Sequence, residues 1–191
     1  TEGEILLDGV NVREIDYDSY MSLFSTVFQD FKLFSFSLAD NISLSLPQDP
    51  VKIEAALRKV GFSSKLDRLP KGLQTAVYKN FEEDGFEPSG GEGQKIALAR
   101  ALYKNAPIVV LDEPTAALDP RAEFEMYRHF HELTEGKTAV YISHRLSSAK
   151  FCDHIAVFEQ GRITEYGTHE QLMDRKGTYA ELFEMQAQYY V

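Results

Sequence analysis

The sequence predicts an α/β protein with a mostly parallel sheet, into which a helical lobe is inserted. Two apolar runs, 108–111 (IVVL) and 138–142 (TAVYI), are typical of strands that are buried on both faces. They alternate with segments of helical character, and this alternation favours parallel pairing. Between a strand expected at 23–28 and the IVVL run, residues 35–105 carry helices and loops without a buried strand, which indicates the inserted lobe.

Length and composition fit one domain, or one domain with a subdomain. The 191 residues are 43% hydrophobic and 26% charged, which is enough apolar material for a core. Thirty acidic against 20 basic residues give a formal net charge of −10, which argues against binding to a nucleic-acid backbone. We therefore expect no nucleic-acid partner.

The chain carries no sequence sign of a disulfide framework, a membrane span or a signal peptide. Cys152 is the only cysteine, which excludes an intrachain disulfide and a cysteine-rich zinc site. No apolar run approaches the roughly 20 residues of a membrane helix, and no basic, apolar N-terminal segment is visible. The first residue is Thr1 rather than methionine, so we expect a fragment of a longer polypeptide.

Local signals predict the elements of the first half. Residues 4–12 place two short apolar runs around Asp8-Gly9, which is a strong hairpin signal. A strand follows at 23–28. Asp49-Pro50 then opens a helix that Gly61 stops, with one apolar face formed by Ile53, Ala56, Leu57 and Val60.

The second half begins with a helix-start signal. Ser89-x-x-Glu92 has the form of a capping box, and the strong helix former KIALARALYK follows it. Pro120 marks the start of a further helix, whose expected apolar face consists of Met126, Phe130 and Leu133.

The C-terminal part predicts a hairpin and a closing helix. Strands are expected near 154–158 and at 162–166, on either side of a turn at Gln160-Gly161. The inward side chains of the closing helix are expected to be Tyr179, Leu182 and Phe183.

Two groups of residues are candidates for a functional site. Asp112-Glu113 ends the IVVL strand, and ligands of open α/β sheets bind beyond the carboxyl ends of the strands. One carboxylate there can hold Mg²⁺ and its neighbour can polarise a water molecule, although two bare acids also fit an ordinary surface loop. The stretch 89–94 (SGGEGQ) leaves backbone N–H groups open to an anion, and it also fits a flexible helix start.

In combination, these residues resemble the ATP-binding cassette (ABC) family of nucleotide-binding domains, and the resemblance covers nearly the whole chain. The family's Q-loop glutamine, signature, Walker B strand with catalytic glutamate, D-loop and switch histidine occur in family order. They match Gln29, Pro88–Gln94 (PSGGEGQ), Ile108–Asp112 with Glu113, Ala117-Leu118-Asp119, and His144.

The resemblance implies a fold of the P-loop NTPase (ABC ATPase) type. It assigns residues 1–34 to an incomplete N-terminal β part with a small antiparallel element. Residues 35–105 correspond to the α-helical signature subdomain, and residues 106–191 to the remainder of the α/β ATPase core.

The resemblance also implies ATP and Mg²⁺ as cofactors. Asp112 and Gln29 would hold the Mg²⁺, and Gln29 would also contact the attacking water. Glu113 would act as general base on that water, and His144 would contact the γ-phosphate as it gains charge.

A further group of residues would act on a nucleotide that a different subunit holds. Ser89, Gly90, Gly91 and Gln94 of the signature would reach its γ-phosphate. Asp119 would cross the same dimer interface. The implied partner is a second nucleotide-binding domain, identical or different.

No phosphate loop of the form G-x-x-x-x-G-K-[ST] occurs in these residues. The only Gly-Lys-Thr is Gly136-Lys137-Thr138, where His131 occupies the position of the first glycine, and it is expected to join a helix to a strand instead of a strand to a helix. By the resemblance, the phosphate loop and the adenine-stacking aromatic residue lie upstream of Thr1. We therefore expect the 191 residues alone to bind ATP very weakly without hydrolysing it.

The signature departs from the family pattern at two places. Pro88 replaces the usual leucine, and Glu92-Gly93 separate the glycines from Gln94.

The segment 28–44 (FQDFKLFSFSLADNISL) resembles the Q-loop region of exporter-type cassettes, whose partner is a transmembrane domain on the same polypeptide. This places the intact protein at the cytoplasmic face of the cell membrane. The loop Phe81–Phe86 occupies the place where exporters touch that domain, and it also fits a solvated connection. Three arrangements fit four apolar side chains of this segment: an exposed patch, a contribution to the core, or a mixture of both. We favour the mixture for Phe31, Leu33, Phe34 and Phe36.

Two alternatives to an exporter remain. A non-transport cassette that uses ATP as a clamp, of the SMC or translation-factor type, predicts coiled-coil insertions or a basic surface, and the sequence shows neither. A catalytically inactive cassette is disfavoured by Glu113 and His144.

Overall fold

The computed structural model describes residues 3–44, 47–114 and 134–189. The chain forms two compact units, Thr1–Val140 and Tyr141–Val191. None of the helices in the described ranges is long and apolar enough to cross a membrane.

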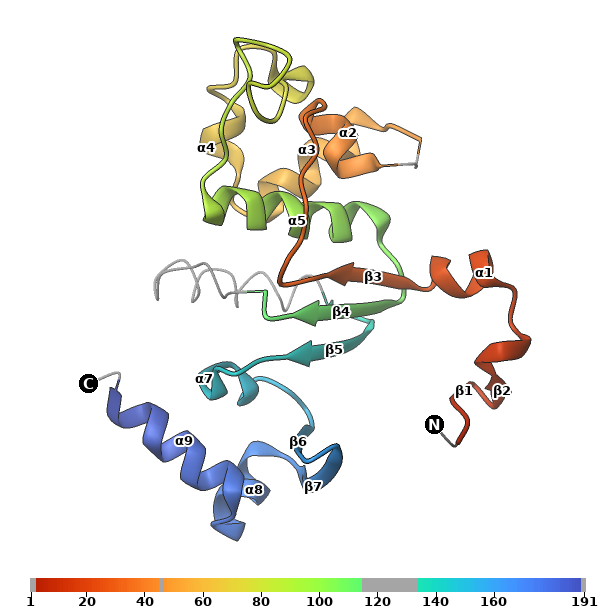
Figure 1. The fold of residues 1–191 in the computed structure, drawn as a ribbon, viewed down its shortest axis with the longest axis vertical. Coiled ribbons are helices and arrows are strands. Elements are labelled where there is room, and N and C mark those ends of the chain that lie inside the picture. The colour runs from red at the N-terminus through yellow and green to blue at the C-terminus, as the bar shows by residue number, and fades with distance from the viewer. Residues whose placement is uncertain (1–2, 45–46, 115–133, 190–191) are drawn as a thin grey trace. The chain divides into compact units, whose positions relative to one another are not determined.

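The first unit contains most of the elements (Figure 1). In chain order these are β1 (Leu6–Leu7), β2 (Val10–Asn11), the 3-10 helix η1 (Val12–Glu14), α1 (Tyr17–Ser22), β3 (Phe24–Val27), α2 (Leu38–Ser43), α3 (Pro50–Lys59), α4 (Ser63–Leu66), the 3-10 helix η2 (Gly72–Gln74), α5 (Gly90–Lys104) and β4 (Ile108–Asp112). Strand β5 (Thr138–Ile142) runs across the boundary between the units. The second unit contains α7 (Leu146–Ala149), β6 (Ile155–Glu159), β7 (Arg162–Gly167), α8 (His169–Arg175) and α9 (Thr178–Tyr189).

The expected N-terminal hairpin is confirmed. Strands β1 and β2 pair antiparallel, with Leu7 opposite Val10. Asp8 and Gly9 have φ values of 49° and 82°, as a two-residue turn with positive φ at both positions requires.

The sheet of the first unit has the strand order β3-β4-β5, and β3 and β4 are parallel. Their register runs from Phe24 opposite Ile108 to Val27 opposite Leu111. The carboxyl ends of both strands therefore lie at the same edge of the sheet.

The expected burial of these strands on both faces is wrong. In β4, Val109 and Leu111 are buried, whereas Ile108 and Val110 are only partly covered. In β5, Val140 and Ile142 are exposed. Among the described elements, β5 is an edge strand of the sheet. Helix α5 packs against β3, so the side chains that α5 covers lie at the opposite edge of the sheet from β5.

The helical lobe packs α2, α3 and α5 together. The helix after Asp49 is confirmed: Asp49 caps it, Pro50 occupies its first turn, and Gly61 follows its end with a φ of 70°. The fully buried side chains of the lobe include Leu38, Ile42, Ile53, Leu57, Ile96 and Leu98.

The buried amide of Asn41 makes hydrogen bonds to the segment that leads from β3 into the lobe. Asn41 Oδ1 accepts from the backbone N–H of Phe34 at 2.9 Å, and Asn41 Nδ2 donates to the carbonyl oxygens of Phe34 and Ser37 at 2.9 and 3.0 Å. The segment presents Phe34 and Phe36, which are 46% and 60% exposed and stack with ring centroids 6.3 Å apart. Phe31 and Leu33 are half-buried, so the expected mixture of surface and core positions is confirmed.

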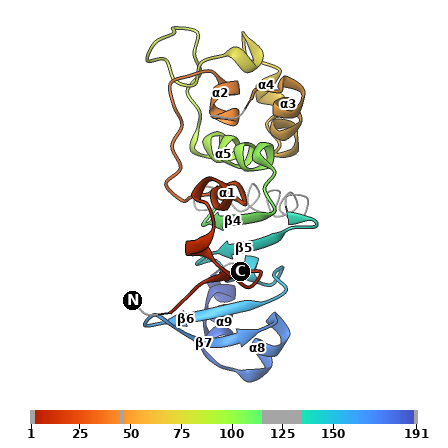
Figure 2. The ribbon, with the colours of Figure 1, turned by 90° about the vertical axis from the view of Figure 1, so that its right-hand side faces the viewer.

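The second unit builds a small core under a hairpin. Strands β6 and β7 pair antiparallel, as expected, and Figure 2 shows them beside α8 and α9. Ile155, Leu172 and Tyr179 form the buried cluster. The Glu165 carboxylate accepts the backbone N–H groups of Thr178 and Tyr179 at 2.8 and 3.0 Å, which fixes the start of α9.

One inward position of α9 is corrected. Tyr179 is buried and Phe183 packs against the cluster, but Leu182 is 41% exposed. Successive helical residues are rotated by about 100°, so Leu182 lies off the face that Tyr179 and Phe183 share. The helix expected after Pro120, with Met126, Phe130 and Leu133, falls outside the described residues.

We predict that Asn41→Ala loosens the segment 34–37, because the Phe34 N–H and the carbonyl oxygens lose their buried partner. The expected decrease in the local free energy of opening is about 1–3 kcal/mol. Hydrogen exchange of the peptide that contains Phe34 measures it.

Asn80→Ala is the matched control, because exposed Asn80 makes one side-chain hydrogen bond to Ser35 Oγ in the same segment. A surface substitution of this kind is expected to change stability by no more than about 0.5 kcal/mol. Equal effects of the two substitutions would contradict the role of Asn41.

Candidate functional site

The edge of the sheet beyond β3 and β4 carries the first group of functional residues. Because Val27 and Leu111 are paired, Gln29 follows β3 at the same edge at which Asp112 ends β4 and Glu113 follows it. Gln29 lies exposed in a turn, and both carboxylates are half-buried. The structure thus brings together the three residues that the sequence singled out at this place.

Glu113 has an unusual backbone conformation. Its φ of 44° lies in the left-handed region, which costs an L-residue with a Cβ about 1–2 kcal/mol. Strained conformations of this kind are concentrated at functional sites. The turn after β4 is therefore a defined feature of the site.

The donor set at this edge fits Mg²⁺. Asp112 offers carboxylate oxygens and Gln29 an amide oxygen, which are the hard ligands that Mg²⁺ takes. Mg²⁺ that is bound with a nucleotide keeps water and phosphate oxygens in its coordination sphere, so one or two protein oxygens suffice.

The start of α5 forms the second group. Ser89 Oγ accepts from the backbone N–H of Glu92 at 3.2 Å, and the Glu92 carboxylate accepts from the N–H of Ser89 at 2.9 Å. This confirms the expected capping box, so Pro88 does not prevent the helix start. Ser89 and Gly90 are exposed and Gly91 is half-exposed, at the positive end of a 15-residue helix. Such a terminus attracts an anion.

Glu92 stabilises this helix terminus. Its second carboxylate oxygen forms an ion pair with Lys65 Nζ at 3.1 Å. Burial acts to raise the pKa of Glu92, but the N–H of Ser89 and the ammonium of Lys65 outweigh it and hold the pKa below its usual value. The negative charge of Glu92 is therefore compensated by Lys65 and by the N–H of Ser89, which belong to the same chain.

Gln94, the last residue of the matched signature, lies apart from the exposed helix start. The side chain is 3% exposed, and Nε2 donates to the carbonyl oxygen of Pro114, next to Glu113. Gln94 lies five residues after Ser89, which turns it by about 500° and places it on the inner face of α5. Its neighbour Gly93 leaves room for Phe31, whose ring would lie 3.2 Å from a Cβ at this position.

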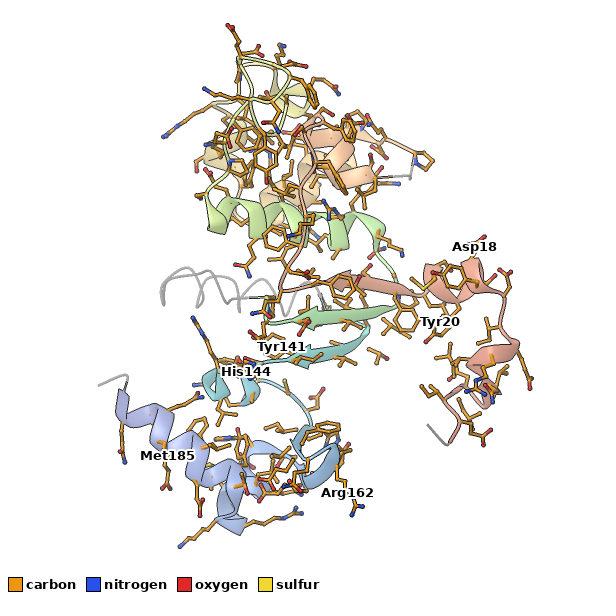
Figure 3. The ribbon with its side chains drawn as sticks, in the orientation of Figure 1. Asp18, Tyr20, Tyr141, His144, Arg162 and Met185 are labelled. Carbon is orange, nitrogen blue, oxygen red and sulfur yellow. The ribbon has the colours of Figure 1, made fainter. Side chains whose placement is uncertain are left out.

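His144 lies in the second unit, exposed, between β5 and α7 (Figure 3). Its carbonyl oxygen accepts from Gln186 Nε2 of α9 at 2.7 Å. Sequence reasoning missed Gln186, because a single glutamine on a helix belongs to no motif.

Two further expectations concern Asp119 and the Gly-Lys-Thr triplet. Asp119 falls outside the described residues. Gly136-Lys137-Thr138 leads into β5, and Lys137 Nζ donates to Asn105 Oδ1 at 2.8 Å. A triplet that precedes a strand lacks the strand-to-helix context of a phosphate loop, as expected.

The fold and these residues define an α/β protein with carboxylate and amide oxygens at a sheet edge and an exposed, glycine-rich helix start. Residues 1–116 match the family model for the ABC transporter. The chain belongs to the ABC transporter family.

Individual relatives agree with this assignment. The chain is 40% identical over 188 residues to an ATP-dependent lipid A-core flippase of Paraburkholderia xenovorans, and 39% identical over 187 residues to that of Haemophilus ducreyi. These matches cover 98% and 97% of this chain and 31% of each flippase, so the chain spans about a third of their length. A solved structure of a bacterial Atm1-family ABC exporter with ATP bound is 35% identical, with a TM-score of 0.88, over 97% of this chain and 32% of the exporter.

We predict that the contribution of Glu92 to the order of the α5 terminus depends on pH. Because its folded-state pKa lies below the usual 4.5, the contribution is present above about pH 4.5 and is lost as the pH falls through the lowered value. Glu92→Gln should therefore speed hydrogen exchange of residues 89–95 at about pH 7 and make little difference at about pH 3. A larger effect in acid than at neutrality would contradict this balance of charges.

Proposed function

We propose that this chain is the signature-bearing part of the nucleotide-binding domain of an ABC exporter, which couples ATP binding and hydrolysis to transport across a membrane. The observation that supports it most is the register of β3 and β4. This register gathers Gln29, Asp112 and Glu113 at one edge of the sheet. The names of the similar proteins, lipid A-core flippases and an Atm1-family exporter, favour an exporter.

The residues at the edge divide the chemistry between them. Glu113 accepts a proton from the attacking water, as a half-buried carboxylate at the end of a strand can do. Asp112 and Gln29 hold the Mg²⁺, which supplies positive charge next to the phosphate oxygens when it is bound. His144 donates a hydrogen bond to the γ-phosphate as negative charge grows there.

The start of α5 serves a nucleotide on another subunit. Ser89, Gly90 and Gly91 lie at the exposed N-terminus of a long helix, so they can meet the γ-phosphate from outside. Gln94 is not part of this contact and instead joins α5 to Pro114. The partner in this arrangement is a second nucleotide-binding domain.

A transmembrane domain is the other proposed partner, and it attaches the intact protein to the membrane. The stacked Phe34 and Phe36 form an exposed pair whose backbone Asn41 fixes. Phe36 lines two adjacent cavities of about 310 and 490 Å³, and Phe81, which is 82% exposed, lines the first of them. Rigidly held exposed aromatic rings are typical of a docking surface.

Ion pairs hold the acidic loop 81–86 to the helical lobe. Lys71 Nζ pairs with Glu82 at 2.7 Å and with Asp84 at 3.0 Å, and Phe86 is buried. The loop therefore presents Phe81 from a fixed base, which supports docking over a merely solvated connection.

The test of this function is Glu113→Gln in the full-length protein. Loss of the general base should lower kcat for ATP hydrolysis by about 10²–10⁴-fold with ATP binding retained. Glu159→Gln, which neutralises an exposed carboxylate of β6 instead, is the matched control.

A Glu113→Gln protein with the kcat of the unsubstituted protein would overturn the proposed role. The purified 191-residue chain should show no ATP turnover, because its residues contain no phosphate-loop motif. Turnover by this chain that Glu113→Gln abolishes would contradict that part of the proposal.

A further inference from the structure

The side chain of Gln186 spans the backbone on both sides of Arg145. Its Nε2 donates to the carbonyl oxygen of His144 at 2.7 Å, and its Oε1 accepts the backbone N–H of Leu146 at 2.9 Å. A carbonyl oxygen only accepts and a backbone N–H only donates, so these partners also fix which end of the amide is which. Both ends of one side chain are thus committed to the segment that contains His144.

Two further hydrogen bonds of this segment are local. Ser143 Oγ accepts the backbone N–H of Arg145 at 2.9 Å, and Ser148 Oγ donates to the carbonyl oxygen of Arg145 at 2.6 Å. Gln186 lies 42 residues from His144, so it connects the turn to a separate helix.

Helix α9 is itself held in place by contacts within the second unit. Glu165 accepts two backbone N–H groups at its start, and Tyr179 is fully buried in the core of the second unit. Phe183 packs against the same core, with its ring centroid 4.9 Å from that of His169. Gln186 follows Tyr179 by seven residues, which is close to two full turns, and so lies on the same face of the helix. Figure 3 shows His144 and, on α9, Met185, which precedes Gln186 in the chain.

We propose that Gln186 is a positioning residue, which holds the backbone of His144 so that its imidazole is placed for the γ-phosphate. This inference rests on the role of His144 in the proposed function. A hydrogen-bond donor aids catalysis when it is fixed in advance where charge develops. A flexible turn would have to be ordered during each turnover, whereas a turn that is bound to α9 is already ordered.

The test compares Gln186→Met with Gln188→Met in the full-length protein. Methionine has a similar length but lacks the amide donors and acceptor, and Gln188 is exposed on the same helix. Gln186→Met should lower kcat by about 10- to 100-fold, as expected for a misplaced catalytic group. The KM for ATP should change by no more than about twofold, and Gln188→Met should leave both constants unchanged.

The same substitution in a His144→Ala background separates positioning from a structural role. If Gln186 acts through His144, Gln186→Met should cause no further decrease in the residual kcat. A full further decrease, an unchanged kcat in the single variant, or a decrease that is matched by a lower unfolding temperature would overturn the proposal. If His144→Ala itself keeps the full kcat, the proposed function of His144 has failed; if only Gln186→Met does, the positioning role alone has failed.

Discussion

The parallel pairing of β3 and β4 is the constraint on which the candidate site depends. Gln29 and Glu113 are 84 positions apart in the sequence, and the helical lobe lies between them. The pairing of Val27 with Leu111 makes their strands end together. A shift of one residue in this register would carry the carboxylates away from Gln29 and reverse the faces to which the strand side chains point.

Helix α5 connects this edge with the lobe. Arg100 Nε donates to the carbonyl oxygen of Asn41 at 2.8 Å, and its guanidinium also donates to the carbonyl oxygen of Lys32 at 3.2 Å. Gln94 reaches the carbonyl oxygen of Pro114, next to the strained Glu113. The helix that Ser89 caps is therefore hydrogen-bonded to both segments that leave the sheet edge.

Local chemistry made much of the fold readable from the sequence. The hairpin at Asp8-Gly9, the helix that begins at Pro50 and the capping box of Ser89 each depend on a few adjacent residues, and all three are confirmed. The motif order likewise identified the edge residues, because strand ends and helix starts determine where their side chains lie.

The errors concern contacts between distant segments. The exposure of Val140 depends on the place of β5 at the edge of the described sheet, which an apolar run does not reveal. Leu182 was assigned to the wrong helix face, because spacing alone does not say which side of a helix is covered. Gln186 acts through two backbone groups, and backbone partners leave no trace in the sequence of either segment.

The central claim is that the sheet edge and the start of α5 form two halves of nucleotide sites that different subunits complete. A structure of the full-length Glu113→Gln protein with ATP and Mg²⁺ tests it most directly. We expect the γ-phosphate to be contacted by His144 of one subunit and by Ser89 and Gly91 of the other, with Gln29 and Asp112 of the first subunit at the Mg²⁺. A nucleotide that Ser89 contacts within its own subunit, or that no signature residue contacts, would contradict the account.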